Sequence, residues 1–318
     1  MAFRAPGKHY RRGISMLDLA RLFPDEEAAR QWFESIVWPD GERDCPRCGS
    51  VNTHEASHPK MPYRCRDCRK YFSVKTGTVM ADSPIPLQKW VYAIYLNLTN
   101  LKGVSSMKLH RDLGVTQKTA WFMQQRIREA FAAFIPSLLS GPVEVDETYM
   151  GGIEKNKHSR MKLHAGRGTV GKVAVVGMRE RDSGMVTARV VDAANANTLQ
   201  GFVQRVAPGG NPIYTDGSSA YDGLANRQAV HHSIGEYVSG KAHVNGVESF
   251  WAMLKRAHKG TFHRLSAKHL QRYVVEFCGR HNIRELDTAM QMGLVAWGMA
   301  GRRVMYQDLV GGERGIAT

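Results

Sequence analysis

Apolar residues recur every three or four positions in the first part of the chain, which is the spacing of helices that bury one side. In the stretch 23–38, Pro24 and a run of acids come first, as a helix N-terminus prefers. Its apolar positions follow at helical spacing: Ala28, Trp32, Phe33 and Ile36. A second stretch, 84–100, predicts an amphipathic helix that begins after Pro86.

Residues 104–131 predict two helices joined by a tight turn. The turn falls at residues 113–115, around a glycine, and Thr116 is placed to cap the second helix. A short helix, a glycine turn and a longer polar and basic helix are typical of a helix-turn-helix, although many helix pairs turn at glycine without touching DNA. The second helix carries the candidate DNA contacts Gln117, Lys118 and Arg126, with Gln124 and Arg128 beside them.

Beyond residue 141 the pattern changes to short apolar and β-branched runs of the length that strands prefer. The first three runs are 142–152, 172–181 and 185–193, and the Asp-Ser-Gly sequence before the third predicts a hairpin. The elements expected after them are a helix at 197–207, a strand at 212–218, a turn or short helix around Tyr221, a strand at 228–233, and helices at 245–258 and 266–281. This order predicts an α/β domain whose sheet is covered by helices.

Basic residues exceed acidic ones and are clustered. The chain of 318 residues carries 44 Lys and Arg against 29 Asp and Glu, a formal net charge of +15. Six of the basic residues fall in each of the segments 60–75, 154–172 and 255–272. A merely soluble basic surface would not need such segregation, so the pattern favours nucleic acid as the partner.

The composition also bounds the class of protein. Hydrophobic residues at 43% and charged residues at 23% are those of an ordinary globular chain. The sequence has no run of about 18 apolar residues, so it predicts no membrane span. Its basic start is not followed by the apolar segment of a signal peptide. We therefore expect a cytoplasmic protein, associated with the nucleoid of a bacterium.

Four of the five cysteines form two Cys-x-x-Cys pairs: Cys45 and Cys48, then Cys65 and Cys68. Two such turns can close a tetrahedral thiolate shell, and their spacing predicts a zinc ribbon holding a structural Zn²⁺. A redox pair or free thiols are the alternatives, but a redox site needs only one such pair. We expect His54 and His58, which lie between the pairs, to be solvated loop residues, and Cys278 to be an ordinary buried thiol.

Three acids lie in otherwise apolar elements of the α/β region. Asp146 lies within the strand 142–152, Asp216 ends the strand 212–218, and Glu248 lies on the helix 245–258. Converging carboxylates repel one another unless divalent cations lie between them, and Mg²⁺ prefers such oxygen ligands. Two ions about 4 Å apart could activate a nucleophile and stabilise the leaving oxygen at a phosphodiester.

Glu248 and Lys255 lie two turns apart on one side of their helix, the side of Trp251, which belongs to the apolar stripe with Phe250 and Leu254. A surface pair without function and a metal ligand followed by a DNA-contacting lysine are both compatible with this pattern. Glu144 and Glu147 flank Asp146, and we expect strand alternation to turn them to the opposite face as structural or solvated residues. For the histidines near this region we expect plain hydrogen-bonding roles: His231, His232 and His243.

Several of these segments together resemble a known family. They read "CPRCGS", "YRCRDCRKYFS", "VDETYMGG", "YTDGSSAY" and "HVNGVESFWAMLKR". They are similar to the DDE transposases of bacterial insertion sequences that carry an N-terminal zinc ribbon, the ISXO-type group, and the likeness runs over about residues 25–283. The resemblance implies an RNase H-like catalytic domain and a Mg²⁺-binding triad at Asp146, Asp216 and Glu248, followed by Lys255. Some relatives carry Asn as the third ligand, which makes Asn245 a competitor.

The resemblance and the patterns together imply a domain order. We expect a helical segment at 1–43, the zinc ribbon at 44–75, a helix-turn-helix-like DNA-binding region at 76–140, the RNase H-like catalytic domain at 141–285 and a C-terminal tail at 286–318. The expected reaction is Mg²⁺- or Mn²⁺-dependent cleavage and transfer of DNA strands at insertion-sequence ends. The alternatives are a DNA-binding regulator derived from a transposase, which should have lost an acid, and another RNase H-like nuclease.

The expected partners are double-stranded DNA, as element ends and as target, and a second copy of the chain, because two DNA ends must be brought together. Besides Gln117, Lys118 and Arg126, basic side chains of the α/β region are candidate DNA contacts: Lys155, Lys157, Arg160, Lys162, Lys255, Arg256 and Lys259.

Overall fold

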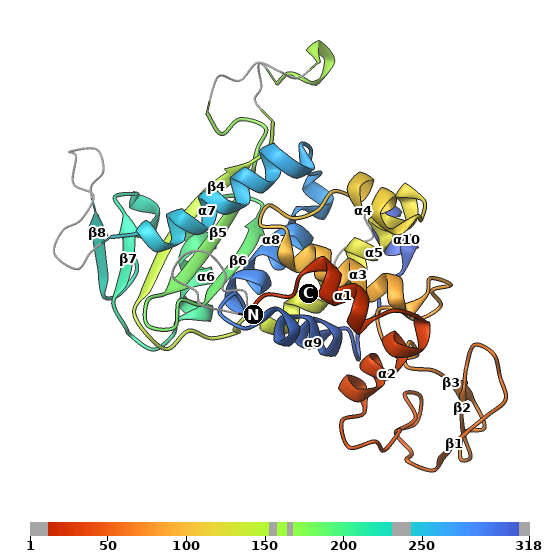
Figure 1. The fold of residues 1–318 in the computed structure, drawn as a ribbon. Helices are drawn as coiled ribbons and strands as arrows, with labels where there is room; N and C mark the ends of the chain where they lie inside the picture. Colours follow the sequence, from red (N-terminus) through yellow and green to blue (C-terminus); the bar gives the residue numbers. More distant parts are fainter. Residues whose placement is uncertain (1–11, 153–157, 164–167, 231–242, 312–318) are drawn as a thin grey trace. The chain divides into compact units, whose positions relative to one another are not determined.

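The computed structural model describes residues 12–152, 158–163, 168–230 and 243–311 (Figure 1). The chain divides into two compact units. The first consists of Met1–Ala133 together with Ile283–Thr318, and the second is Phe134–Asn282. Each unit is considered by itself below.

The first unit begins with two short helices, α1 (Met16–Leu22) and α2 (Glu26–Val37). Each starts where a side chain satisfies the free backbone N–H groups of its first turn. Ser15 caps α1 and Asp25 caps α2, where its carboxylate accepts the N–H of Ala28 at 2.8 Å. The helix predicted at 23–38 is therefore present as α2.

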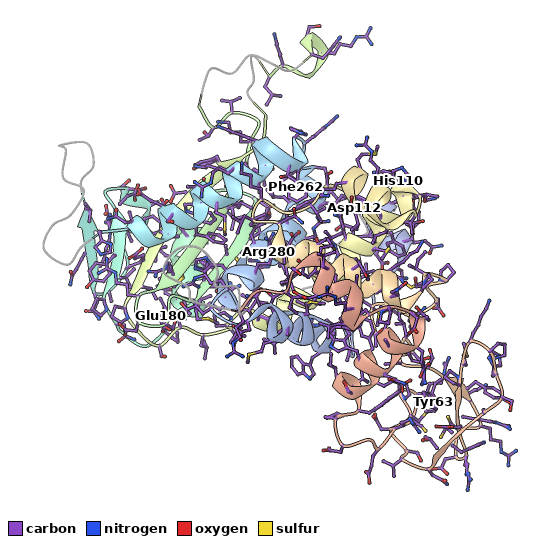
Figure 2. The ribbon with its side chains drawn as sticks, in the orientation of Figure 1. Tyr63, His110, Asp112, Glu180, Phe262 and Arg280 are labelled. Atoms are coloured by element: carbon purple, nitrogen blue, oxygen red, sulfur yellow. The ribbon has the colours of Figure 1, made fainter. Side chains whose placement is uncertain are left out.

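A small three-stranded antiparallel sheet follows, with β2 (Tyr63–Cys65) between β1 (Thr53–Glu55) and β3 (Tyr71–Phe72). Its core is little more than three aromatic rings. The ring of Tyr63 (labelled in Figure 2) lies 5.6 Å from that of Phe72 and 5.6 Å from that of Trp38 at the end of α2. So few apolar contacts would give this sheet little stability without a further link.

The helical part of the first unit is built around α3 (Leu87–Thr99), whose first N–H groups are capped by the carboxylate of Glu26 at 2.7 and 2.9 Å. The helix is buried on nearly every side, with Trp90, Val91 and Ile94 fully inaccessible. The prediction of an amphipathic helix here was wrong, because α3 is the centre of the unit and not a helix at its edge.

The two helices predicted at 104–131 and the tight turn between them are present as α4 (Ser106–Leu113) and α5 (Gln117–Ala130). Gly114 between them takes a left-handed conformation with φ of 58°, which glycine adopts without strain. Thr116 caps α5, as its side chain accepts the N–H of Thr119 at 3.1 Å.

The segment after residue 285 was predicted to be a C-terminal tail. In its described part it contains two further helices of the first unit. These are α9 (Thr288–Gly298), which packs against α3, and α10 (Tyr306–Val310). A bridge between Thr78 and Ala300 fixes the end of α9 to the segment before α3. The chain thus leaves the first unit at residue 133 and returns to complete it at 283.

The second unit is a five-stranded sheet in the order β6-β5-β4-β7-β8. The strands are β4 (Val143–Met150), β5 (Val173–Glu180), β6 (Val186–Val191), β7 (Ile213–Asp216) and β8 (Arg227–Val230). The first three pair antiparallel, whereas β7 is parallel to β4 and β8 is parallel to β7. This order and these directions confirm the predicted α/β, RNase H-like class.

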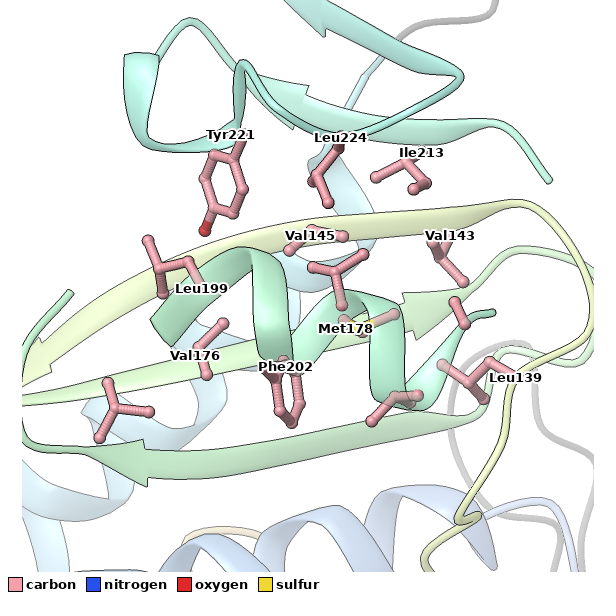
Figure 3. Close-up of a cluster of buried hydrophobic side chains, with 14 of the residues drawn as sticks. Leu139, Val143, Val145, Val176, Met178, Leu199, Phe202, Ile213, Tyr221 and Leu224 are labelled. Atoms are coloured by element: carbon pink, nitrogen blue, oxygen red, sulfur yellow. The ribbon is translucent and has the colours of Figure 1, made fainter. Parts of the chain in front are cut away.

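Helices cover both faces of this sheet. On one face α6 (Ala196–Val206) packs Leu199 and Phe202 against Val143 and Val145 of β4 (Figure 3). On the other face α7 (Asn245–Ala257) and α8 (Ala267–Asn282) pack against β4, β5 and β6. Short helical turns complete the unit: η3 (Ser159–Met161), η4 (Ser219–Tyr221) and the π-helical turn η6 (His258–Phe262).

Candidate metal centre and carboxylate site

The four cysteines of the small sheet bring their sulfur atoms together between two tight turns. All four Sγ atoms lie within 4.8 Å of one another, and the Cys45–Cys68 and Cys48–Cys65 separations are both 3.6 Å. None of them forms a disulfide. Zn–S bonds of about 2.3 Å place the sulfurs of a tetrahedral site about 3.8 Å apart, so this donor set fits Zn²⁺.

The backbone around Cys65 favours the thiolate form of that residue, whereas at Cys48 the lowering by the Ser50 N–H is outweighed by desolvation and the neighbouring thiols, which raise the pKa to about 12. Hydrogen bonds from backbone N–H groups, above all that of Cys68, lower the pKa of the Cys65 thiol to about 7. The thiolate is the form that binds zinc. His54 and His58 do not belong to the ligand group. The description of both as solvated loop residues was wrong for His54, which is half-buried on β1.

In the second unit, strand pairing sets two of the candidate acids beside each other. β4 and β7 pair with Val143 opposite Ile213 and Glu144 opposite Tyr214. The same register, continued by two residues, brings Asp146 level with Asp216, the last residue of β7. Residues level with each other on neighbouring strands point to the same face, which here is the face covered by α7.

The surroundings of Asp146 disfavour its charged form. Burial, above all, and then the negative charges of Glu147, Asp216 and Glu248 raise the pKa of the Asp146 carboxyl to about 7. Asp216 and Glu248 therefore lie close enough to Asp146 to influence its charge. Carboxylate oxygens are the ligands that Mg²⁺ prefers, but among the described residues only the four cysteines have their ligand atoms gathered closely enough to hold one ion together.

Glu248 lies in the first turn of α7, on its exposed side. The opposite side is a stripe of fully buried residues: Val247, Phe250, Trp251 and Leu254. Lys255 is exposed two turns further along, as the helical spacing predicts, and Asn245 is the exposed first residue of the helix. The close packing of the stripe is visible at Gly177 of β5, where an added Cβ would lie 2.6 Å from the Trp251 ring.

Glu147 follows Asp146 but faces α6. Its carboxylate accepts a hydrogen bond from the Tyr221 hydroxyl at 2.6 Å, and burial raises its pKa. Tyr221 itself is fully buried in the cluster beneath α6 (Figure 3). The sequence prediction that Glu147 turns to the opposite face from Asp146 agrees with this arrangement.

The same prediction was wrong for Glu144, since residues two apart on a strand share a face. Glu144 is fully buried on the α7 side. Its carboxylate accepts the Arg181 Nε–H at 3.1 Å and the Val247 N–H at 3.0 Å. Two more basic groups lie close: Arg179 at 3.9 Å and His243 at 3.2 Å.

Glu144 thus joins the centre of the sheet to the start of α7, the helix that carries Glu248. Arg181 extends the same link, because its Nη2–H donates to the His243 carbonyl at 2.6 Å and its guanidinium lies 3.5 Å from the Tyr214 ring centroid. One signal for this cluster was visible in the sequence: an acid two residues before Asp146 in an apolar strand.

The candidate DNA contacts differ in their exposure. Lys255, Arg256 and Lys259 are exposed at the end of α7 and in η6, Arg160 is exposed in η3, and Lys162 is half-buried. Lys155 and Lys157, like His231 and His232, lie outside the described residues. On α5, Gln117 and Lys118 are exposed, whereas Arg126 is only 7% exposed.

No helix among the described residues combines the length and the apolar character needed to cross a membrane.

Comparison with known proteins gives two family matches along the chain. Residues 24–71 match the transposase zinc-ribbon domain, and residues 138–282 match the ISXO2-like transposase domain. A protein of Halobacterium salinarum, named as an uncharacterized protein in the transposable element ISH50, is 32% identical over 258 residues. That alignment covers 76% of this chain and 86% of the archaeal protein.

Proposed function

Since this chain belongs to the ISXO2-like transposases with a zinc ribbon, we propose that it cleaves and transfers DNA strands at the ends of an insertion sequence with the help of divalent cations. One observation carries the assignment of the site. The β4–β7 register, continued beyond its last pair, sets Asp146 level with Asp216, and the pKa of Asp146 responds to the charge of Glu248 on α7. This neighbourhood supports the assignment of the three acids to one site.

In this proposal Asp146, Asp216 and Glu248 hold two Mg²⁺ ions. When bound, such ions lower the pKa of an attacking hydroxyl and stabilise the negative charge on the leaving oxygen of a phosphodiester. The protein fixes the three carboxylates on a strand, a strand end and a helix, so that little reorganisation is needed when DNA arrives. The same site serves both steps, first with water and then with the freed 3′-hydroxyl as the nucleophile.

The basic side chains around the acids support a DNA substrate. Lys255 and Arg256 on α7 and Lys259 in η6 follow Glu248 by about two to three helical turns. Phosphate groups held there would lie next to the acidic site, and the release of their counterions would drive binding. In this proposal the zinc ribbon and α4–α5 hold the element's terminal inverted repeats, and at least two copies of the chain bring the two ends together.

The test is a strand-transfer assay with the flanking inverted repeats of the element and Mg²⁺ or Mn²⁺. We expect Asp146→Asn to lose cleavage and joining while it keeps its fold and its DNA affinity. Asp192→Asn, which changes an exposed acid after β6, is the matched control and should retain activity. An Asp146→Asn protein that joined strands at the rate of the unaltered chain would refute the assignment.

The third ligand can be tested in the same assay. Glu248→Gln should abolish strand transfer, whereas Asn245→Ala should reduce it less, because the charge of Glu248 acts on Asp146. The reverse result would assign the third ligand to Asn245. A chain that bound the repeats tightly but neither cut nor joined them under any of these conditions would instead be a DNA-binding regulator.

A further inference from the structure

A pocket of about 270 Å³ lies within the first unit, between the start of α3, one side of α5 and α10. It extends from the exposed Lys118 to the fully buried Trp90. Its walls are mainly apolar and come from separate segments of the chain: Pro84 and Ile85, Phe122 and Met123, and Tyr306. Such a concave apolar site with a few polar groups is the usual form of a ligand-binding pocket.

Two N–H groups in this pocket lack a hydrogen-bond acceptor within the described part of the chain. They are the indole Nε1–H of Trp90 and the Nε–H of Arg126, and both atoms are inaccessible to solvent. A buried donor without an acceptor costs about 1–3 kcal/mol, so buried donors are nearly always paired. Because neither atom is accessible from the cavity, the polar group that an occupant can reach at its inner end is the partly exposed guanidinium of Arg126.

Arg126 also carries a charge that no acid neutralises at close range. It is 7% exposed, and among the described residues it forms no ion pair, while Asp82 attracts it only at longer range. Its guanidinium lies 4.1 Å from the Phe122 ring centroid, and the Lys118 ammonium lies 4.6 Å from that of Tyr306. Burial lowers the pKa of Arg126, because removing the charged guanidinium from water is unfavourable.

Among the described residues no acid lines the pocket, so its two cations favour an anionic occupant. A phosphate group alone would make no favourable contact with the apolar walls. An occupant therefore also needs an apolar or aromatic part that packs against them. A nucleotide supplies both parts. Its base carries carbonyl and ring-nitrogen acceptors for the Arg126 guanidinium, and its phosphate suits an exposed lysine.

We propose that this pocket holds one nucleotide displaced from a DNA strand, with its base against Phe122 and Ile85 and its phosphate next to Lys118. The proposal rests on DNA being the substrate of the proposed function, and it adds a site at which an unpaired base is held. The position supports it, because Lys118 lies in the first turn of α5, the second helix of the helix-turn-helix arrangement.

The location can be tested with a short single-stranded oligonucleotide that carries one 5-iodo-deoxyuridine, bound to the full chain and irradiated. We expect cross-links to Phe122 or Tyr306 in the peptides identified by mass spectrometry. Met123→Trp, which fills the pocket from its wall, should reduce these cross-links. Cross-links found only in the second unit, or unchanged by the filled pocket, would overturn the proposal.

The affinity can be tested by comparing the same oligonucleotide with a strand of equal length and charge that lacks its bases. We expect Arg126→Met to weaken binding of the base-bearing strand roughly tenfold, and that of the abasic strand much less. Lys102→Met, which removes an exposed charge outside the pocket, is the matched control and should weaken both strands equally. An equal loss for both strands with Arg126→Met would show that only charge matters and would overturn the proposal.

Arg126→Met should melt at or above the temperature of the unaltered chain, since it removes an unpaired buried charge. Both binding measurements are made without divalent cations and so do not depend on strand cleavage. If the chain cuts DNA but gives no cross-link in the pocket, only the nucleotide-pocket proposal is refuted. If it gives the cross-link but never cuts DNA, only the catalytic proposal is refuted.

Discussion

The buried carboxylate of Glu144 accepts the backbone N–H of Val247 at 3.0 Å and so ties the start of β4 to the first turn of α7. Glu248, the next residue, is therefore held in position by an acid that is not itself a candidate metal ligand. The ring of basic groups around Glu144 offsets the cost of burying its charge.

Glu144→Gln keeps the size of this side chain and removes its charge. We expect a loss of about 3–5 kcal/mol in the free energy of unfolding, because the neutral amide no longer balances the positive charges of Arg179 and Arg181 around it. Chemical denaturation measures this loss. The control is Glu285→Gln, where the side chain is 65% exposed and less than about 1 kcal/mol is expected. Equal stability of the two variants would show that Glu144 does not hold α7.

The cysteine site should govern the folding of the ribbon. We expect the purified chain to bind one zinc ion through its four-cysteine group and Cys48→Ser to lose it, with unfolding of the small sheet. Elemental analysis and limited proteolysis between residues 44 and 75 report the two effects. Cys278→Ala removes the fifth cysteine, which is buried in the second unit, and should leave the zinc content unchanged. Zinc loss in both variants would argue against a ribbon-specific site.

The contact between Gly177 and Trp251 predicts a steric effect. A Cβ at residue 177 would lie 2.6 Å from the indole ring, so Gly177→Ala should displace α7 and destabilise the chain by about 1–3 kcal/mol. Gly201→Ala in the middle of α6 meets nothing within 4 Å and should be neutral or stabilising by up to about 1 kcal/mol. Thermal melting of the pair distinguishes the steric effect from the general effect of adding a methyl group.

The hydrogen bond from Tyr221 to Glu147 should contribute to stability independently of catalysis. Tyr221→Phe removes the donor and leaves a partly buried carboxylate, which should cost about 1–3 kcal/mol. Tyr71→Phe on β3 alters a partly exposed hydroxyl and should change stability little. If Tyr221→Phe unfolded at the same denaturant concentration as the unaltered chain, Glu147 would have to be satisfied in some other way.

Glu180 predicts a dependence of stability on pH. The Ser183 hydroxyl and the N–H groups of Ser140 and Gly141 donate to its carboxylate and lower its pKa. A lowered pKa contributes stability that is full above the ordinary value of 4.5 and is lost as the pH falls through the folded value. The stability difference between the unaltered chain and Glu180→Gln should therefore be constant near neutral pH and shrink below about pH 4.5. A difference that grew on acidification would contradict this.

The sequence predicted the elements of the second unit well because its strands and helices differ in period and length. The runs 142–152 and 172–181 became β4 and β5, and the helix 245–258 became α7. The cysteine pairs were equally readable, since the ligands of a zinc ribbon come from two short local turns.

The roles of residues that depend on contacts with distant parts of the chain could not be predicted from the local sequence pattern. Glu144 is paired with Arg181 and Val247, and nothing local in the sequence shows that pairing. Arg126 is a basic residue on the second helix of the pair, where a DNA contact is expected. It lines a pocket instead, because Tyr306 and Trp90 pack around α5. Likewise, α3 is central only because α9 arrives from the end of the chain to cover it.

That late arrival of α9 has a consequence for synthesis. When the ribosome has made residues 12–133, the central helix of this unit still has an uncovered apolar side, and it stays so until residues 283–311 emerge. The α/β sheet can fold within that interval, since all its strands and helices are already available. Biogenesis should therefore proceed from the middle outward, and a transcript ending before residue 283 should yield a folded sheet attached to an aggregation-prone amino-terminal half.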